Sequence, residues 1–154
     1  MGNLYRREGG ATLIVVATAA EKKIAADRWP GEVIVETGVG GLNVYKALSG
    51  YDRGEPVINF GYAGSNSIPV GTEVSVGRCR LLHPNVSYEE AEFLLDGNTD
   101  CWTFCDFVLE AEMEDPVVFD MELAFILAMG FSNVKSIKVV SDNLSIEEYE
   151  KTTK

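Results

Sequence analysis

Two carboxylate-bearing segments in the last third of the chain have the residue types and spacing needed for chemistry. Asp120-Met121-Glu122 opens an apolar run that we expect to be a helix, and Ser141-Asp142 closes the β-branched run that begins at Ile137. Such a run predicts a buried strand of a parallel sheet, and open α/β folds bind ligands at the carboxyl ends of these strands. The sequence therefore predicts that Glu122 and Asp142 meet at one rim of a sheet, where carboxylates can bind a ligand or transfer protons.

Two glycine-containing segments are expected to turn at the same rim. Thr37–Asn43 follows a predicted strand and precedes a predicted helix, a place where backbone amides can bind an anion or the edge of a sugar. The dinucleotide pattern G-x-G-x-x-G is not met, because Asn43 stands at its third glycine position, and a tight turn that packs helix against strand is the alternative. Gly61–Ser65 predicts a second small-residue turn. Two such turns beside two carboxylates predict a pocket.

Buried β-rich runs alternate with amphipathic runs along the first half of the chain, which predicts an α/β protein. We expect a three-layer α/β/α sandwich with a mixed, mainly parallel central sheet. Expected strands are 12–17, 32–36, 56–60, 72–82, 99–104 and the run ending at Val140; expected helices are 19–28, 39–48, a short one starting at Ser87, one from about Pro116 and a last turn from Ser145.

The size and charge of the chain limit the classes of protein to which it can belong. Its 154 residues, 46% of them hydrophobic and 24% charged, suit a single domain over residues 11–154 that follows a flexible arm, 1–10. A net charge of −11 without a basic stripe argues against nucleic acid and anionic membranes as partners. No apolar run is long enough to span a bilayer and no signal peptide is recognisable, so we expect a soluble, cytoplasmic protein.

The three cysteines, Cys79, Cys101 and Cys105, are an odd number without a dense spacing pattern. We therefore expect free thiols in a reducing compartment. Cys101 and Cys105 are four positions apart, but a zinc site would need further cysteine or histidine ligands, and His83 is the only histidine. We expect no bound metal ion.

Taken together, the segments resemble the nucleoside phosphorylase and nucleosidase superfamily, whose small members cleave the N-glycosidic bond of purine nucleosides. The resemblance extends over most of the chain, and the order and spacing of its short motifs make it specific. Longer relatives have a middle segment between about His83 and Asn98 and a final helix that continues well past Glu150, so the resemblance implies a shortened member. The residues that carry it are Ala17–Glu21, Thr37–Asn43, Asn59–Gly64, Val70–Val74, Phe107-Val108, Asp120–Glu122 and Ser141-Asp142.

The resemblance implies roles for the acidic residues. Asp142 would be the general acid that protonates the purine leaving group, and Glu122 would bind the ribose 2′- and 3′-hydroxyls. Glu21 would be the base that orients the attacking water, and Met121 would pack against the ribose. These roles suit the chemistry, because an N-glycoside leaves through an oxocarbenium-like transition state, and a general acid typically accelerates such a step by roughly 10²–10⁴-fold.

The remaining implied residues would contact the base. Phe107 would stack on it and the Val108 backbone would hydrogen-bond to it. Ala63 and Gly64 would let the base approach closely, and Ser141 would bind substrate beside Asp142.

The implied reaction is hydrolysis of an adenosine-type nucleoside or 5′-thio analogue to free base and ribose, without a cofactor. A phosphorylase needs basic groups for inorganic phosphate, and the turn Ala17–Ala20 offers none, so phosphorolysis is the second alternative. The third is a non-catalytic member that binds a nucleoside. We expect a homodimer or higher homo-oligomer, with Tyr45, Tyr62 and Phe93 as candidate interface aromatics.

Each candidate residue also has a purely structural interpretation. Asp142 suits a helix N-cap or a turn, and Glu122 and Asp120 suit first-turn positions favoured by the helix dipole. Glu21 lies beside two lysines at the start of a helix and suits a solvated face, and an aromatic such as Phe107 is more often a core residue than a stacking platform.

Overall fold

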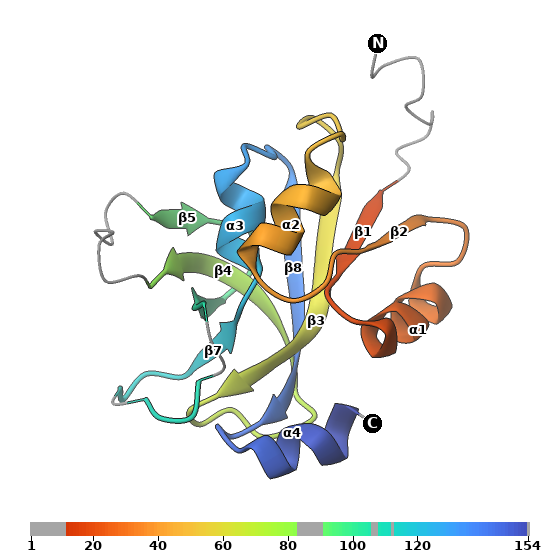
Figure 1. Cartoon of the computed structure of the whole chain (residues 1–154). Coiled ribbons are helices and arrows are strands. Elements are labelled where there is room, and N and C mark those ends of the chain that lie inside the picture. The colour runs from red at the N-terminus through yellow and green to blue at the C-terminus, as the bar shows by residue number, and fades with distance from the viewer. Residues whose placement is uncertain (1–11, 83–90, 106–107, 112, 154) are drawn as a thin grey trace.

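The computed structural model describes residues 12–82, 91–105, 108–111 and 113–153. These residues form eight strands and four helices, shown in Figure 1. The strands are β1 Leu13–Val16, β2 Val33–Glu36, β3 Val57–Ser65, β4 Glu73–Leu81, β5 Glu92–Leu94, β6 Thr99–Thr103, β7 Val117–Asp120 and β8 Val134–Asp142. The helices are α1 Ala19–Arg28, α2 Gly41–Leu48, α3 Leu123–Ala128 and α4 Ile146–Thr153.

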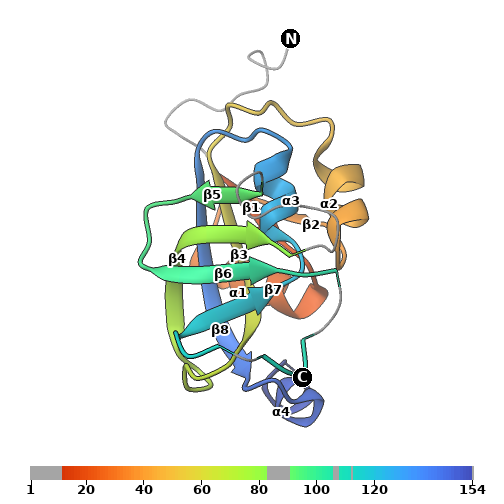
Figure 2. The ribbon, with the colours of Figure 1, turned by 90° about the vertical axis from the view of Figure 1, so that its left-hand side faces the viewer.

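The sheet is mixed, as expected, but it closes on itself. β2, β1, β3 and β8 pair in parallel, β8 pairs antiparallel with β4, β4 and β6 pair in parallel, and so do β6 and β7. β7 then returns to β3 through antiparallel pairs at Gly64 and Ser65. Five strands, β3, β8, β4, β6 and β7, thus form a ring, seen in Figure 2. The expected three-layer sandwich is not confirmed, because a register shift at Ala63/Gly64 and the length of β3 let the sheet curl.

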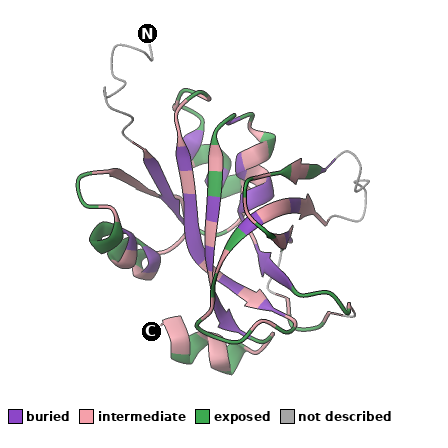
Figure 3. Ribbon diagram, turned by 180° about the vertical axis from the view of Figure 1, so that it is seen from behind, coloured by how far each residue is buried: buried purple, intermediate pink, exposed green. Residues whose placement is uncertain are grey.

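A layered arrangement does hold around β1, whose residues are buried on both faces. Ile14 and Val16 pack in a cluster with Ala25 of α1, whereas Leu13 and Val15 pack in a cluster with residues of α2 and α3. This two-sided burial explains the continuous apolar sequence of β1. A third cluster of residues from β3, β4, β6, β7, β8 and α3 fills the ring, and Figure 3 shows the buried strands and the more exposed outer helices.

Two expected elements are wrong. The chain from Pro116 continues into a strand, β7, and the helix begins only at Leu123. The reason is that the β-branched Val117 and Val118 pair with β6, and Val118 joins the cluster that fills the ring. The segment Gly61–Ser65 is the second half of β3, not a turn. β5 was not expected. The arm 1–10 and the helix start at Ser87 lie outside the described residues.

Of the three candidate interface aromatics, only Tyr45 has a largely exposed side chain, at 59%. Phe93 packs against the cluster that fills the ring, and Tyr62 is half-buried. Among the described residues, no helix is both long and apolar enough to cross a membrane.

Candidate functional site

Six of the predicted site residues line one small pocket at the carboxyl ends of β1, β3, β7 and β8. The volume of this pocket is about 70 Å³. The predicted residues in its wall are Glu21, Ala63, Gly64, Met121, Glu122 and Ser141; the others are Ala17, Thr18, Val39, Tyr62, Phe119, Asp120 and Tyr149.

Glu21 is buried at the first turn of α1 and joins this helix to β3. The Thr18 hydroxyl accepts a hydrogen bond from the Glu21 amide at 3.2 Å, and one carboxylate oxygen of Glu21 accepts from the amides of Ala17 and Thr18 at 2.8 and 3.2 Å. This capping box fixes the side chain. The second carboxylate oxygen accepts from the Tyr62 amide at 2.9 Å. Glu21 therefore does not lie on a solvated face, and its carboxylate is held in the pocket wall.

Gly61 makes this arrangement possible, and its substitution gives a first prediction. A Cβ atom at position 61 would lie 2.7 Å from a carboxylate oxygen of Glu21. Gly61→Ala should therefore lower the free energy of unfolding by about 1–3 kcal/mol, because Glu21 must shift within a packed wall. Urea denaturation measures this, with Gly50→Ala as the control, since a Cβ there meets nothing within 4 Å. Equal stability of the two variants would contradict the assignment.

Glu122 directly precedes α3 and is 9% exposed. Its side chain does not cap the helix; one carboxylate oxygen instead accepts a hydrogen bond from the Gly40 amide at 2.9 Å. Burial and the neighbouring charge of Asp120 raise the pKa of Glu122 to about 7, against the opposing effects of Lys138 and the Gly40 amide. Glu122 is thus not a first-turn acid of the helix, and it titrates near neutral pH.

The sequence suggested two roles for the glycine segment at the start of α2: a backbone-amide site for an anion, and a tight packing turn. The structure shows features of both. Gly40 has φ +91°, a conformation that glycine adopts readily, and this turns its amide onto Glu122. Gly41 lies against the Phe125 ring, where a Cβ would come within 2.6 Å of a ring carbon. The turn therefore packs α2 against α3 and also binds a carboxylate.

Asp120 suited a first-turn position of the helix by its sequence, but it lies before α3. It is buried at the end of β7 and forms an ion pair of 3.0 Å with Lys138, whose side chain is 1% exposed. Although burial alone would raise the pKa of Asp120, the nearby Lys138 and the donors Thr103 and Leu123 bring it below its ordinary value. The signal for this pair was Lys138 within the run Ile137–Val140, whose other three residues are apolar.

Asp142 ends β8 as predicted but lies behind the pocket wall. Its side chain is fully buried; one carboxylate oxygen accepts from the Ser141 hydroxyl at 2.6 Å, and the other accepts from the amides of Leu144 and Ser145 at 3.0 and 3.2 Å. The structural interpretation of Asp142 as a turn residue is therefore confirmed. Ser141 and Gly64, which do line the pocket, lie directly beside it.

Phe107 was predicted to stack on the base, and the Val108 backbone to hydrogen-bond to it. Val108 is described but is not part of the pocket wall, and Phe107 lies outside the described residues. Tyr149 of α4 was missed. Its side chain lines the pocket together with Glu21 and Glu122, and burial and the charges of Glu21, Glu122 and Asp142 raise its pKa.

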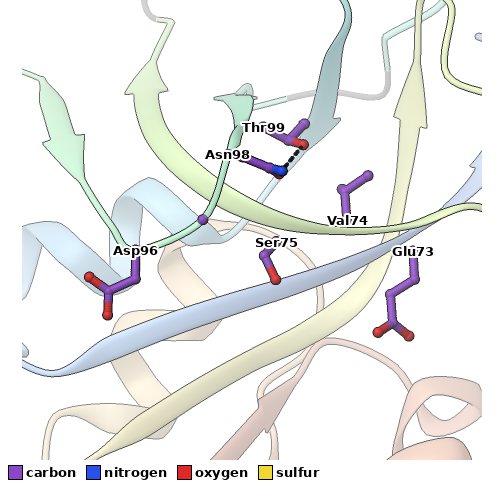
Figure 4. A pocket seen from close by; sticks show the side chains of 7 residues that line it. Glu73, Val74, Ser75, Asp96, Asn98 and Thr99 are labelled. Carbon is purple, nitrogen blue, oxygen red and sulfur yellow. Dashed lines mark hydrogen bonds between the residues drawn. The ribbon is translucent and has the colours of Figure 1, made fainter.

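A larger surface hollow, about 550 Å³, lies between the start of β4 and the turn joining β5 to β6 (Figure 4). It contains none of the predicted site residues. Glu73 and Asp96 lie at opposite ends of it in this view, and Glu73 forms an ion pair with Arg28. The small pocket, which brings carboxylates together, is the better candidate site.

Solved structures with this fold were found, although no family model and no curated protein matches the sequence. MTAN from Chlamydia trachomatis bound to adenine has a TM-score of 0.74 and 18% identity, over 92% of this chain and 88% of that chain. The 5′-methylthioadenosine/S-adenosylhomocysteine nucleosidase from Neisseria meningitidis, in complex with methylthio-immucillin-A, has a TM-score of 0.71 and 15% identity, over 94% and 92%. Futalosine hydrolase of Helicobacter pylori has a TM-score of 0.69 and 12% identity, over 92% and 90%. The chain therefore has the fold of the nucleosidases of the nucleoside phosphorylase and nucleosidase superfamily, as its sequence motifs suggested.

Proposed function

We propose that this protein is a nucleosidase that hydrolyses the N-glycosidic bond of a purine ribonucleoside, of the adenosine or 5′-thio type, to free base and sugar. The observation that carries the proposal is the charge of the pocket wall. Glu21, Asp120 and Glu122 all line it, and none of its described lining residues is lysine or arginine. Such a wall favours a neutral sugar that becomes cationic in the transition state.

The same charge distribution disfavours phosphorolysis. Inorganic phosphate is an anion near neutral pH, and a wall of carboxylates repels it. Lys138, the nearest buried cation, is already paired with Asp120. Hydrolysis needs only water, which Glu21 would orient from its fixed position at the start of α1.

Glu122 and Met121 would bind the ribose. An ionised Glu122 accepts hydrogen bonds from two vicinal hydroxyls, and its Gly40 contact occupies only one lone pair of one oxygen. Ala63 and Gly64 would leave room for the base, and Asp142 would donate the proton to it.

Catalysis requires the pocket to enlarge, since nucleoside-sized ligands occupy sites of about 300–1,000 Å³. The element best suited to move is α4 with the turn before it. α4 has no buried residue, and Leu144 in that turn holds a left-handed φ of 64°, which is costly for a side chain with Cβ. Movement of this turn would also release Asp142 from the Leu144 and Ser145 amides.

A non-catalytic nucleoside-binding protein is the second candidate, and the burial of Asp142 favours it. If the turn never releases Asp142, the pocket has sugar ligands but no acid. Homodimer formation, the absence of metal and cofactor, and a cytoplasmic location stay predictions.

The test compares purine ribonucleosides and their 5′-thio analogues, incubated with purified protein with and without phosphate, with free base measured by chromatography. Base release that is independent of phosphate supports the proposal. Release only with phosphate identifies a phosphorylase, and a thermal shift with adenosine without base release identifies a binding protein.

A further inference from the structure

A buried ion pair joins Asp120 of the pocket wall to Lys138 behind it, and its two residues come from strands that both pair with β3. Lys138 is in β8 and faces the interior together with Val140, while Asp120 ends β7. Their charged atoms are 3.0 Å apart, and both side chains are essentially inaccessible to solvent. A buried pair of this kind contributes little net stability compared with apolar residues of similar size, so its presence calls for another role.

Both carboxylate oxygens of Asp120 are fully used. One accepts from the Thr103 hydroxyl at 2.5 Å and from the Cys101 thiol at 3.4 Å; the other accepts from Lys138 and from the Leu123 amide at 2.8 Å. The Thr103 hydroxyl accepts in turn from the Ala124 amide at 3.1 Å. Asp120 and Thr103 therefore bind the first amides of α3, a task that the residue before a helix usually performs.

These contacts affect Glu122. This residue directly precedes α3, but its side chain does not cap the helix. Because the helix amides are already bound, its carboxylate is free to lie in the pocket wall and to accept from Gly40. We propose that the Lys138–Asp120 ion pair is a positioning device for Glu122: Lys138 holds Asp120 on the Leu123 amide at the start of α3, and this leaves the Glu122 carboxylate in the pocket wall for ribose binding. The assignment of ribose to Glu122 rests on the proposed function. The effect of the ion pair on the position and ionisation of Glu122 does not.

Four charged or titratable groups face Glu122 from separate elements. Asp120 of β7 and Glu21 of α1 disfavour its ionised form, Lys138 of β8 favours it, and the Tyr149 phenol of α4 is close enough for Glu122 to affect the tyrosine pKa. Lys138 itself stays charged: although burial alone would lower its pKa, the charges of Asp120 and Glu122 raise it. Lys138 thus provides the favourable charge in this group.

The test follows the ionisation of Glu122 by carbon-13 NMR of its carboxyl group, assigned by its absence in Glu122→Gln. Lys138→Met should raise the midpoint by about one pH unit or more, and Asp120→Asn should lower it, because the two neighbours have opposite charges. The double variant should return toward the wild-type midpoint, and Lys138→Arg should retain it. Lys135→Met, an exposed lysine on the same strand, is the matched control and should leave the midpoint unchanged.

The acid limb of the pH profile of kcat/KM should move with the Glu122 midpoint. At pH 6, kcat/KM of Lys138→Met should therefore fall about tenfold for each pH unit by which the midpoint rises. Should Lys138→Met fail to fold, Asp120→Asn still tests the inference, because the Glu122 midpoint must fall in that variant. Midpoints that stay at the wild-type value in the folded variants would overturn the inference. Midpoints that move as described in a protein that releases no base would retain the positioning role and reject the nucleosidase.

Discussion

Replacing Asp142 with asparagine is expected to lower base release by about 10²–10⁴-fold while the fold persists. The asparagine carbonyl can still accept from the Leu144 and Ser145 amides, so the turn after β8 is retained. What is lost is the proton that the leaving purine must receive. Single-turnover assays with excess protein measure this loss directly.

The matched control for this substitution is Asp27→Asn, which changes an exposed aspartate on α1 in the same way. It should release base at the wild-type rate. Thermal unfolding of both variants separates a chemical effect from a folding effect. An Asp142→Asn variant with wild-type activity would remove Asp142 from the mechanism, and the hydrogen bonds of its carboxylate would then be its whole role.

Replacing Glu122 with glutamine is expected to weaken ribose binding and to stabilise the protein at alkaline pH. A carboxylate that accepts hydrogen bonds from hydroxyls contributes about 1.5–3 kcal/mol, so kcat/KM should fall by roughly 10- to 100-fold. The Gly40 amide can still donate to the glutamine carbonyl, so the turn before α2 should be retained.

The stability effect follows from the raised pKa of Glu122. The folded protein holds this proton up to about pH 7, whereas an unfolded chain releases it near pH 4.5, so the free energy of unfolding falls between these values and stays lower above them. The loss is at most about 3 kcal/mol. Glu122→Gln lacks this loss, and urea denaturation should therefore show it gaining on the wild type between pH 5 and pH 8. An unchanged difference at the two pH values, or the same gain in the exposed control Glu150→Gln, would contradict the prediction.

The sequence predicted elements well where one pattern had one structural meaning. The apolar run of β1 is buried on both faces, as such a run predicts, and helix α1 covers the predicted range, 19–28. The run from Val117 was ambiguous, because apolar residues without a clear period suit a strand or a helix. The run forms a strand because it pairs with β6, and no local sequence pattern reveals this pairing.

The candidate site was predicted to a similar extent. Glu21 and Glu122 lie in one pocket wall, because the strands that precede them in the chain, β1 and β7, end at the same rim of the sheet. The burial of Asp142 was not predictable in detail, since it depends on the turn at Leu144, and Tyr149 reaches the pocket only through the placement of α4. Ring closure between β3 and β7 likewise joins segments far apart in the chain.

The most direct test of the central claim is release of adenine from 5′-methylthioadenosine by the wild-type protein in phosphate-free buffer, followed by chromatography. The nucleosidase proposal predicts adenine in an amount equal to the sugar product, at a rate that Asp142→Asn reduces by at least about 100-fold and Asp27→Asn does not change. No base release from this compound or from any other purine ribonucleoside, by a protein that binds adenosine, would contradict it.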